Sequence, residues 1–262
     1  MSERPIGVFD SGVGGLTVVA ALARHLPKES LLYLGDTARL PYGTKSPATV
    51  RRYTERNVEF LVERGVKAVV VACNTASALA LPDLALPVPT WGVIEPGAAA
   101  AAARSAGRVG VIATESTVAS DAYGRALRAL RPELTVLSQA CPLFVPLVEE
   151  GWHDDPVTEE VALRYLSPLI EREIDTLVLG CTHYPLLAGV LARVAGPRVA
   201  LVDSAESTAE RVARELGGLG LARRRGKPEH HFCVTDAAER FHRLAHLILG
   251  DRPERLELVE VV

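Results

Sequence analysis

The chain has 262 residues, of which 48% are hydrophobic and 23% charged, and its formal net charge is −3. This composition predicts a globular protein with one large or two modest domains, and the weak charge argues against a nucleic-acid partner. No apolar run approaches the ~20 residues that span a bilayer and the first residues lack a signal-peptide pattern, so we expect a cytoplasmic protein without a membrane partner.

The chain opens with the apolar run Ile6–Phe9, which is typical of a buried strand and is followed by Asp10, Ser11 and a Gly-rich turn. Apolar residues at helical spacing begin at Leu16, so a strand, a turn and a helix start a doubly wound sheet. The third glycine of a dinucleotide-binding motif is replaced by Thr17. We expect the N–H groups of the turn to bind a small anion such as a carboxylate instead.

A second strand is predicted at Leu31–Leu34, and the loop after it contains Pro41, Tyr42 and Gly43. This strand should end at the same sheet edge as the first one. The loop is therefore either a simple turn or a binding loop.

The run Ala68–Val71 predicts a strand that is buried on both faces, and it is followed by Cys73, Asn74 and Thr75. In an open α/β sheet, ligands bind in the crevice outside the carboxyl ends of the strands. Cys73 is therefore a candidate for chemistry, and the alternative is a buried structural thiol.

The second half of the chain repeats this plan. Residues 109–204 have the same order of elements as residues 6–94, which indicates an internal duplication. In the repeat, Thr114 takes the position of Ser11, and Cys181, followed by Thr182 and His183, takes the position of Cys73. The other strands are predicted at 87–93, 108–114, 135–137, 176–180, 199–202 and 232–235. The other helices are predicted at 47–64, 76–80, 97–103, 120–130, 144–150, 159–174, 208–216 and 241–249, and one more helix follows Cys181 and ends at residue 194.

We predict an α/β fold with two doubly wound parallel-sheet domains that are related by pseudo-two-fold symmetry and face each other across a cleft. Residues 1–97 and 207–262 form the first domain, because the late strand needs a sheet to join, and residues 98–206 form the second.

Two thiols on opposite walls of a cleft suit a reaction with mirror-image halves, in which a proton leaves one face of a carbon and another enters the opposite face. A free thiol has a pKa of ~8.5, which lies close enough to neutrality for either role. Asp10 and His183 are plausible proton partners. Hydroxyl and amide groups at the strand ends could bind the carboxylates of an amino acid, and they belong to Ser11, Asn74, Thr75, Thr114, Thr117 and Thr182.

Cofactors and metals are not expected. A pyridoxal-phosphate racemase needs a Schiff-base lysine, and no lysine lies at a strand end of these motifs. Four cysteines in a cytosolic chain of this length do not suggest a disulfide framework. They have no CxxC spacing, which argues against zinc and thioredoxin-type motifs. Cys141 and Cys233 are expected in the core, and His230 and His231 on the surface without an acidic or thiol partner.

The motifs Asp10–Gly15, Pro41–Gly43, Ala72–Thr75 and Gly180–Pro185 resemble those of the aspartate/glutamate racemase family, and the likeness covers nearly the whole chain. The resemblance implies two flavodoxin-like domains, a homodimer, and cofactor-independent interconversion of L- and D-glutamate that supplies D-glutamate for peptidoglycan. It implies that Cys73, assisted by Asp10, acts on the D-enantiomer. Cys181, assisted by His183 with Glu149 behind it, acts on the L-enantiomer.

The resemblance also implies the substrate-binding residues, which are Asp10, Ser11, Pro41, Tyr42, Gly43, Asn74, Thr75, Thr114, Thr117, Thr182 and His183. Three alternatives remain open at this stage: an aspartate racemase of the same family, a thiol-based redox or metal protein, and a non-catalytic amino-acid-binding module.

Overall fold

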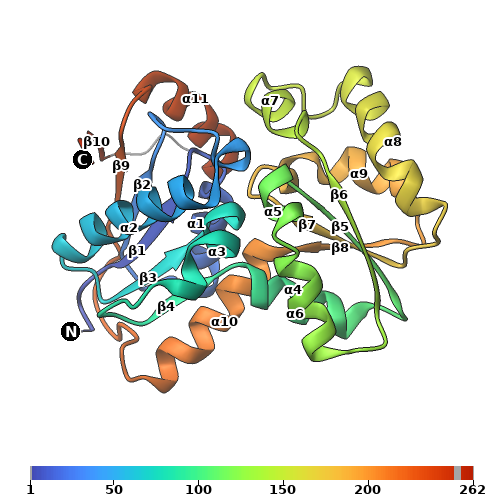
Figure 1. The fold of residues 1–262 in the computed structure, drawn as a ribbon. Coiled ribbons are helices and arrows are strands. Elements are labelled where there is room, and N and C mark those ends of the chain that lie inside the picture. The colour runs from blue at the N-terminus through green and yellow to red at the C-terminus, as the bar shows by residue number, and fades with distance from the viewer. Residues whose placement is uncertain (1, 251–254, 262) are drawn as a thin grey trace.

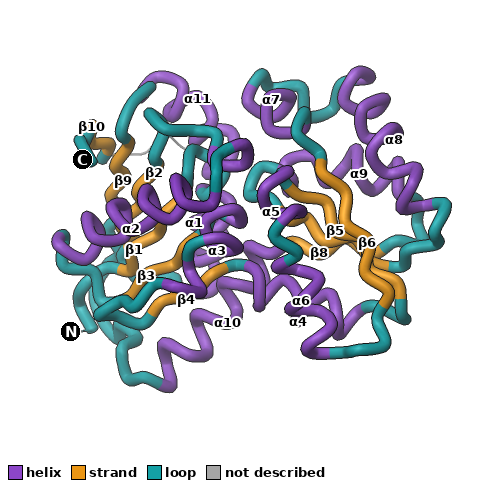
Figure 2. Tube along the Cα trace, in the orientation of Figure 1, coloured by secondary structure: helices purple, strands orange, loops and turns teal. Residues whose placement is uncertain are grey.

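The computed structural model describes residues 2–250 and 255–261, which form two parallel sheets with helices on both faces of each (Figures 1 and 2). The strands are β1 (Ile6–Asp10), β2 (Leu31–Gly35), β3 (Ala68–Val71), β4 (Thr90–Gly92), β5 (Arg108–Ala113), β6 (Thr135–Ala140), β7 (Thr176–Gly180), β8 (Ala200–Asp203), β9 (His230–Val234) and β10 (Leu256–Leu258). The α-helices are α1 (Leu16–His25), α2 (Pro47–Glu63), α3 (Asn74–Leu79), α4 (Ile94–Arg104), α5 (Glu115–Ala119), α6 (Ala122–Leu130), α7 (Phe144–Glu149), α8 (Pro156–Ile170), α9 (Ala188–Ala195), α10 (Ser204–Gly218) and α11 (Ala238–Leu249). Short 3-10 helices are η1 (Tyr42–Thr44), η2 (Leu81–Asp83) and η3 (Tyr184–Leu187). None of the helices in these ranges is long and apolar enough to cross a bilayer.

The two sheets repeat one strand order. The first sheet runs β10-β9-β2-β1-β3-β4 and the second runs β6-β5-β7-β8. The order β2-β1-β3-β4 in the first half therefore matches β6-β5-β7-β8 in the second. All of these pairings are parallel, so the loops that follow β1, β3, β5 and β7 meet at the carboxyl edges of their sheets.

The central strands form where the sequence predicted them because their apolar residues are buried on both faces of the sheet. Every residue of β1 and β3 is buried, and Phe9 lies in register with both Leu34 and Val71. Central strands of this kind stay in place because both faces pack against helices.

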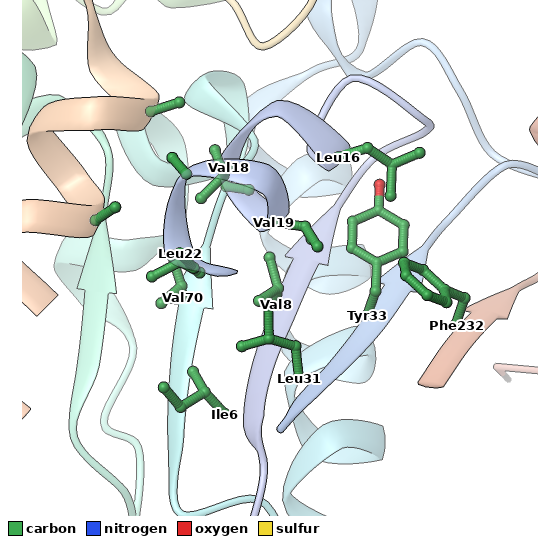
Figure 3. Close-up of a cluster of buried hydrophobic side chains, with 14 of the residues drawn as sticks. Ile6, Val8, Leu16, Val18, Val19, Leu22, Leu31, Tyr33, Val70 and Phe232 are labelled. Atoms are coloured by element: carbon green, nitrogen blue, oxygen red, sulfur yellow. The ribbon is translucent and has the colours of Figure 1, made fainter. Parts of the chain in front are cut away.

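Helix α1 covers one face of the first sheet with its apolar side. Leu16, Val19 and Leu22 project from α1 toward Val8 and Tyr33 of the sheet (Figure 3). Burial of each such side chain stabilises the fold by about 1.5–3 kcal/mol. This packing fixes the start of α1 and thus the Gly-rich turn before it.

The C-terminal segment extends the first sheet rather than the second. Strand β9 pairs with β2, and β10 pairs with β9. Helix α10 packs against both α1 and α4, which belong to different halves. The division into domains at 1–97 plus 207–262 and 98–206 remains a proposal; of these residues, 1, 251–254 and 262 lie outside the described part.

Some element boundaries differ from those expected. The helix expected at 120–130 is α6, which begins at Ala122, and the short helix α5 before it was not expected; Asp121, which has a φ of 52°, lies between the two helices. The helix expected up to Ile174 ends at Ile170, since Glu173 is left-handed with a φ of 54°. Strand β10 was not expected at all.

The expectation that His231 lacks acidic and thiol partners is wrong. Cys233 lies opposite Glu257 in the register of β9 and β10. The carboxylate oxygen Oε2 of Glu257 is 3.3 Å from His231 Nε2 and 3.9 Å from Cys233 Sγ. Arg64 already binds both oxygens of this carboxylate, at 2.8 and 3.0 Å, so an ion pair occupies the cluster.

Candidate active site

Both predicted cysteines line one cavity of about 40 Å³ between the two sheets. The first half contributes Ser11, Gly12, Leu40, Pro41, Tyr42, Gly43, Cys73, Asn74 and Thr75, and the second half contributes Thr114, Val145, Glu149, Cys181, Thr182 and His183. The turns after β1, β3, β5 and β7 supply most of these residues, so the duplicated strand ends converge on one site.

Cys73 lies between β3 and α3 and caps the helix. Its sulfur accepts a hydrogen bond from the N–H of Ala76 at 3.5 Å, and its S–H donates to Ser11 Oγ at 3.3 Å. Burial, and then the negative charge of Asp10, raise the pKa of Cys73 to about 12. The resting group is therefore a thiol, which can donate a proton.

Cys181 follows β7 and has a different surrounding. Its Sγ lies 3.9 Å from Nδ1 of His183, whose Nε2 lies 3.1 Å from Oε1 of Glu149. Burial alone would lower the pKa of His183, but its hydrogen bonds to Cys181 and Glu149 outweigh burial and raise this pKa to about 10. The imidazole is therefore protonated at neutral pH and lies between the carboxylate of Glu149 and the sulfur of Cys181.

Asp10 lies at the end of β1, behind the cavity wall rather than in it. It is fully buried, and its carboxylate accepts hydrogen bonds from Gly12 N–H at 2.9 Å and from Thr182 Oγ1 at 3.4 Å. Burial raises the pKa of Asp10, and the charge of His183 and these hydrogen bonds oppose the rise. Asp10 thus connects the first sheet to the loop that carries His183.

Three threonine hydroxyls form a cluster between the halves. Thr75 Oγ1 lies 3.0 Å from Thr114 Oγ1 and 3.3 Å from Thr117 Oγ1, and the last two lie 3.0 Å apart. Thr75 and Thr114 line the cavity, whereas Thr117 lies behind them. These hydroxyls can rotate and donate to a ligand carboxylate.

Asn74 has an unused donor. Its Oδ1 accepts a hydrogen bond from the hydroxyl of Tyr123 at 2.7 Å. Its buried Nδ2 has no partner among the described residues. Buried polar atoms are almost always paired, so a ligand oxygen is the natural partner for this amide.

The loop at Pro41–Gly43 is anchored from behind. The Tyr42 hydroxyl donates to Oδ2 of Asp36 at 2.5 Å. Burial, and then the adjacent Asp36 carboxylate, raise the pKa of Tyr42 far above its ordinary value. Gly43 approaches the opposite half so closely that a Cβ would lie 2.6 Å from Cβ of Thr114.

The structure therefore brings together every predicted site residue, with Asp10 and Thr117 placed just behind the cavity. Gly12, Leu40 and Val145 also line the cavity and were not predicted. Arg240 was missed as well: its Nη2 lies 2.7 Å from Oε2 of Glu149. No local pattern around Arg240 distinguishes it from other charged residues on a helix.

Comparisons with known proteins agree with this geometry. The family model described as Asp/Glu/Hydantoin racemase matches residues 9–212. The curated glutamate racemase of Geobacter metallireducens is 53% identical over 256 residues, which cover 96% of this chain and 95% of the relative.

Solved structures extend the likeness to the fold. The glutamate racemase of Thermus thermophilus in complex with β-chloro-D-alanine is 52% identical, with a TM-score of 0.91 and coverage of 99% of this chain and 98% of that one. The glutamate racemase of Francisella tularensis in complex with D-glutamate is 38% identical, with a TM-score of 0.94 and coverage of 100% and 99%. The predicted fold class and the predicted family resemblance are both confirmed.

Proposed function

The chain belongs to the Asp/Glu/Hydantoin racemase family, and on that premise we propose that it is a glutamate racemase that works by proton transfer between two cysteines. The observation that carries the proposal is that Cys73 and Cys181, from corresponding positions of two repeated sheets, line the same cavity. Relatives that are named glutamate racemases and are about half identical over nearly the full length support the choice of glutamate as the substrate.

In the proposed L-to-D direction, the thiolate of Cys181 takes the α-proton of L-glutamate, and the electron pair of the C–H bond stays on the substrate as a carbanion. The thiol of Cys73 then gives its proton to the opposite face. D-glutamate leaves with Cys181 as thiol and Cys73 as thiolate, and exchange with solvent restores the starting state. The D-to-L direction uses the same steps in reverse order.

The neighbours of each thiol support this assignment. Protonated His183 lies beside Cys181, where its positive charge stabilises a thiolate. Cys73 is held in its thiol form by burial and by Asp10, as the acid of the L-to-D direction requires.

The proposed substrate-binding groups supply donors for two carboxylates. We assign this role to Ser11, Asn74, Thr75, Thr114 and Thr182, with the loop at Pro41–Gly43 closing over the substrate. The unused Nδ2 of Asn74 and the rotating threonine hydroxyls support it. Asp10, Thr117 and Glu149 act behind them.

The route proposed here uses no pyridoxal phosphate. A Schiff base needs a lysine in the site, and among the described residues no lysine lines the cavity. Lys67, for example, is buried elsewhere against Glu29.

The deciding experiment incubates the protein with L-glutamate in deuterated buffer without an added cofactor. We expect the circular dichroism of the solution to decay to zero while NMR detects deuterium entering at the α-carbon. Aspartate in place of glutamate tests the nearest alternative, an aspartate racemase.

The other two alternatives predict different outcomes in the same assay. A non-catalytic binding module would be saturated by glutamate without loss of optical activity. A redox or metal protein would contain a disulfide or an ion between Cys73 and Cys181, which mass measurement under non-reducing conditions would detect. None of the four cysteines is in a disulfide in the structure.

Three further proposals rest on the family resemblance. We propose that the D-glutamate formed enters peptidoglycan synthesis, that the protein acts in the cytoplasm, and that it is a homodimer. Light scattering with size-exclusion chromatography tests the last of these.

A further inference from the structure

Arg240 belongs to the first half of the molecule, whereas its ion-pair partner, Glu149, belongs to the second half. It lies on α11, whose residues Phe241 and Leu244 belong to the core of the first sheet. Its partner Glu149 ends α7, which packs in the core of the second sheet. Helices α11 and α7 face each other from the two halves at the same end of the molecule (Figure 1). The 2.7 Å ion pair between Arg240 and Glu149 therefore bridges the halves.

Glu149 uses its two oxygens for two different partners. Oε2 accepts from Arg240 Nη2 at 2.7 Å, and Oε1 lies 3.1 Å from His183 Nε2. The Glu149 side chain is only 8% exposed. A carboxylate held at both oxygens has little freedom to rotate, and its bond to one ring nitrogen of His183 fixes the direction of the other. That other nitrogen, Nδ1, points to Cys181 at 3.9 Å.

We infer that Arg240 is a positioning residue for the reaction proposed above: by holding Glu149 from the opposite half, it keeps His183 aligned with Cys181 when the two halves are closed. The inference rests on the proposed function.

The position of the ion pair links closure of the halves to the chemistry. Residues of both halves line the cavity, so a substrate bound there lies between the halves, and we expect the halves to separate when it enters. Arg240 and Glu149 belong to different halves, so their ion pair breaks on opening and forms again on closing. Its half-exposed arginine, at 41%, is compatible with repeated solvation.

The charges around His183 determine what the loss of Arg240 should change. His183 is in contact with Glu149 and Cys181, and the charge of Asp10 acts on it from the first sheet. Burial opposes ionisation of Glu149, whereas His183 and then Arg240 lower the pKa of Glu149. Removal of Arg240 therefore raises this pKa, so the ionised carboxylate that aligns His183 is lost at a higher pH.

The test compares Arg240→Met with Arg240→Lys and with a matched control, Arg243→Met. Arg243 lies on the same helix and is exposed, and it forms no salt bridge within the described residues. For Arg240→Met we expect kcat to fall about threefold to thirtyfold, a smaller change in KM, and an acid limb of the pH–rate profile shifted to higher pH. Arg240→Lys restores most of kcat and the position of the limb, and Arg243→Met leaves both unchanged.

Isotope effects test whether the change lies at Cys181. Cys181 removes the deuteron from α-deuterated L-glutamate, so slower transfer at Cys181 makes this abstraction more rate-limiting. Cys73 removes the deuteron from α-deuterated D-glutamate, and that abstraction becomes less rate-limiting because the later transfer at Cys181 is slower. The primary isotope effect of Arg240→Met should therefore rise with the L-enantiomer and fall with the D-enantiomer. In a Glu149→Gln background, Arg240→Met should have no further effect, because the two residues act as one unit.

Unchanged kcat in Arg240→Met would overturn the inference. So would a fall in kcat without a shift of the acid limb, a failure of lysine to restore activity, or an equal loss in Arg243→Met. These outcomes are read against an active wild-type protein. An inactive wild type would instead contradict the proposed function.

Discussion

The two thiols of the cavity differ in their partners, and each is required for one half of the proposed reaction. We expect Cys73→Ser and Cys181→Ser each to reduce racemisation by at least about 10²-fold, because a general acid or base commonly contributes 10²–10⁴-fold. The circular dichroism assay with L-glutamate measures the loss.

Cys233→Ser is the matched control, since Cys233 is equally buried but lies on β9, away from the cavity. The melting temperature should stay close to that of the wild type in both catalytic variants. Full activity in either of them would end the two-base interpretation.

His183 makes folding stability depend on pH in a predictable direction. Its pKa is raised to about 10 in the folded protein, against ~6.5 in an unfolded chain. The protonated form is thus favoured by folding, so its contribution is fully present below pH ~6.5 and is lost as the pH rises toward 10. Other groups near it are Glu149, Cys181, Asp10 and Arg240.

We therefore expect the difference in the free energy of unfolding between the wild type and His183→Gln to be largest near pH 6 and to shrink steadily up to pH 10. Urea unfolding at a series of pH values measures it. A difference that grows with pH would contradict the assignment of a protonated imidazole.

At the scale of elements, the loop that contains Pro41–Gly43 is held by a single buried carboxylate. Asp36 follows β2 and is completely buried. It accepts hydrogen bonds from Arg39 Nε at 2.8 Å, Tyr42 Oη at 2.5 Å, Asn57 Nδ2 at 3.2 Å and Thr235 Oγ1 at 3.1 Å. One residue thus joins the loop, α2 and the C-terminal segment.

Asp36→Asn replaces one acceptor oxygen by an NH₂ group that faces donors. Loss of such a buried partner costs about 1–3 kcal/mol. Because the loop is proposed to bind substrate rather than to transfer protons, we expect KM to rise about tenfold and kcat to change less. Asp154→Asn, in an exposed ion pair with Arg193, is the control and should leave KM unchanged. A fall in kcat at constant KM would exclude this role for the loop.

The sequence predicted the elements whose burial is set by short-range pattern. Uninterrupted apolar runs located β1, β3 and β7, and the polar residues directly after them located the cysteines. It did not predict the separate helix α5 or the early end of α8, because the left-handed residues that follow these helices, Asp121 and Glu173, are not glycine. Strand β10 is a short edge strand of three residues, Leu256–Leu258, and its pairing depends on a partner that lies elsewhere in the chain.

The sequence pattern predicted the site residues at the strand ends, whereas Glu149 on α7 was predicted only from the family resemblance. Cys73 and Cys181 each follow a buried run and have a threonine within two residues, so the sequence pattern alone predicted that they lie in the site. Asp36 and Arg240 act through side chains that reach across from other elements. The contact between Glu149 and Arg240 joins residues that are 91 positions apart, and no periodicity carries that information.

At the scale of the whole molecule, the closed site depends on a close approach between the halves at Gly14. A Cβ at this position would lie 2.5 Å from His183 Nδ1 and would also overlap Oγ1 of Thr182. We expect Gly14→Ala to hold the halves apart and to displace His183, and activity to fall by at least about 10²-fold, since misplacement by about 1 Å can have this effect.

Each half keeps its own core in Gly14→Ala, so the melting temperature should change little. Gly107→Ala is the control, because a Cβ there meets nothing within 4 Å. Activity close to that of the wild type in Gly14→Ala would mean that the halves need not approach so closely for catalysis.

The return of β9 and β10 to the first sheet has a consequence for the order in which the chain can fold during synthesis. Domains usually fold as they leave the ribosome, the N-terminal one first. Here the strands of the second sheet, β5 to β8, are all synthesised by Asp203, while β2 still lacks its neighbour β9 at His230–Val234. The sheet that starts to form first is therefore completed after the second one, and β2 remains an open edge, prone to wrong pairing, until β9 has been synthesised.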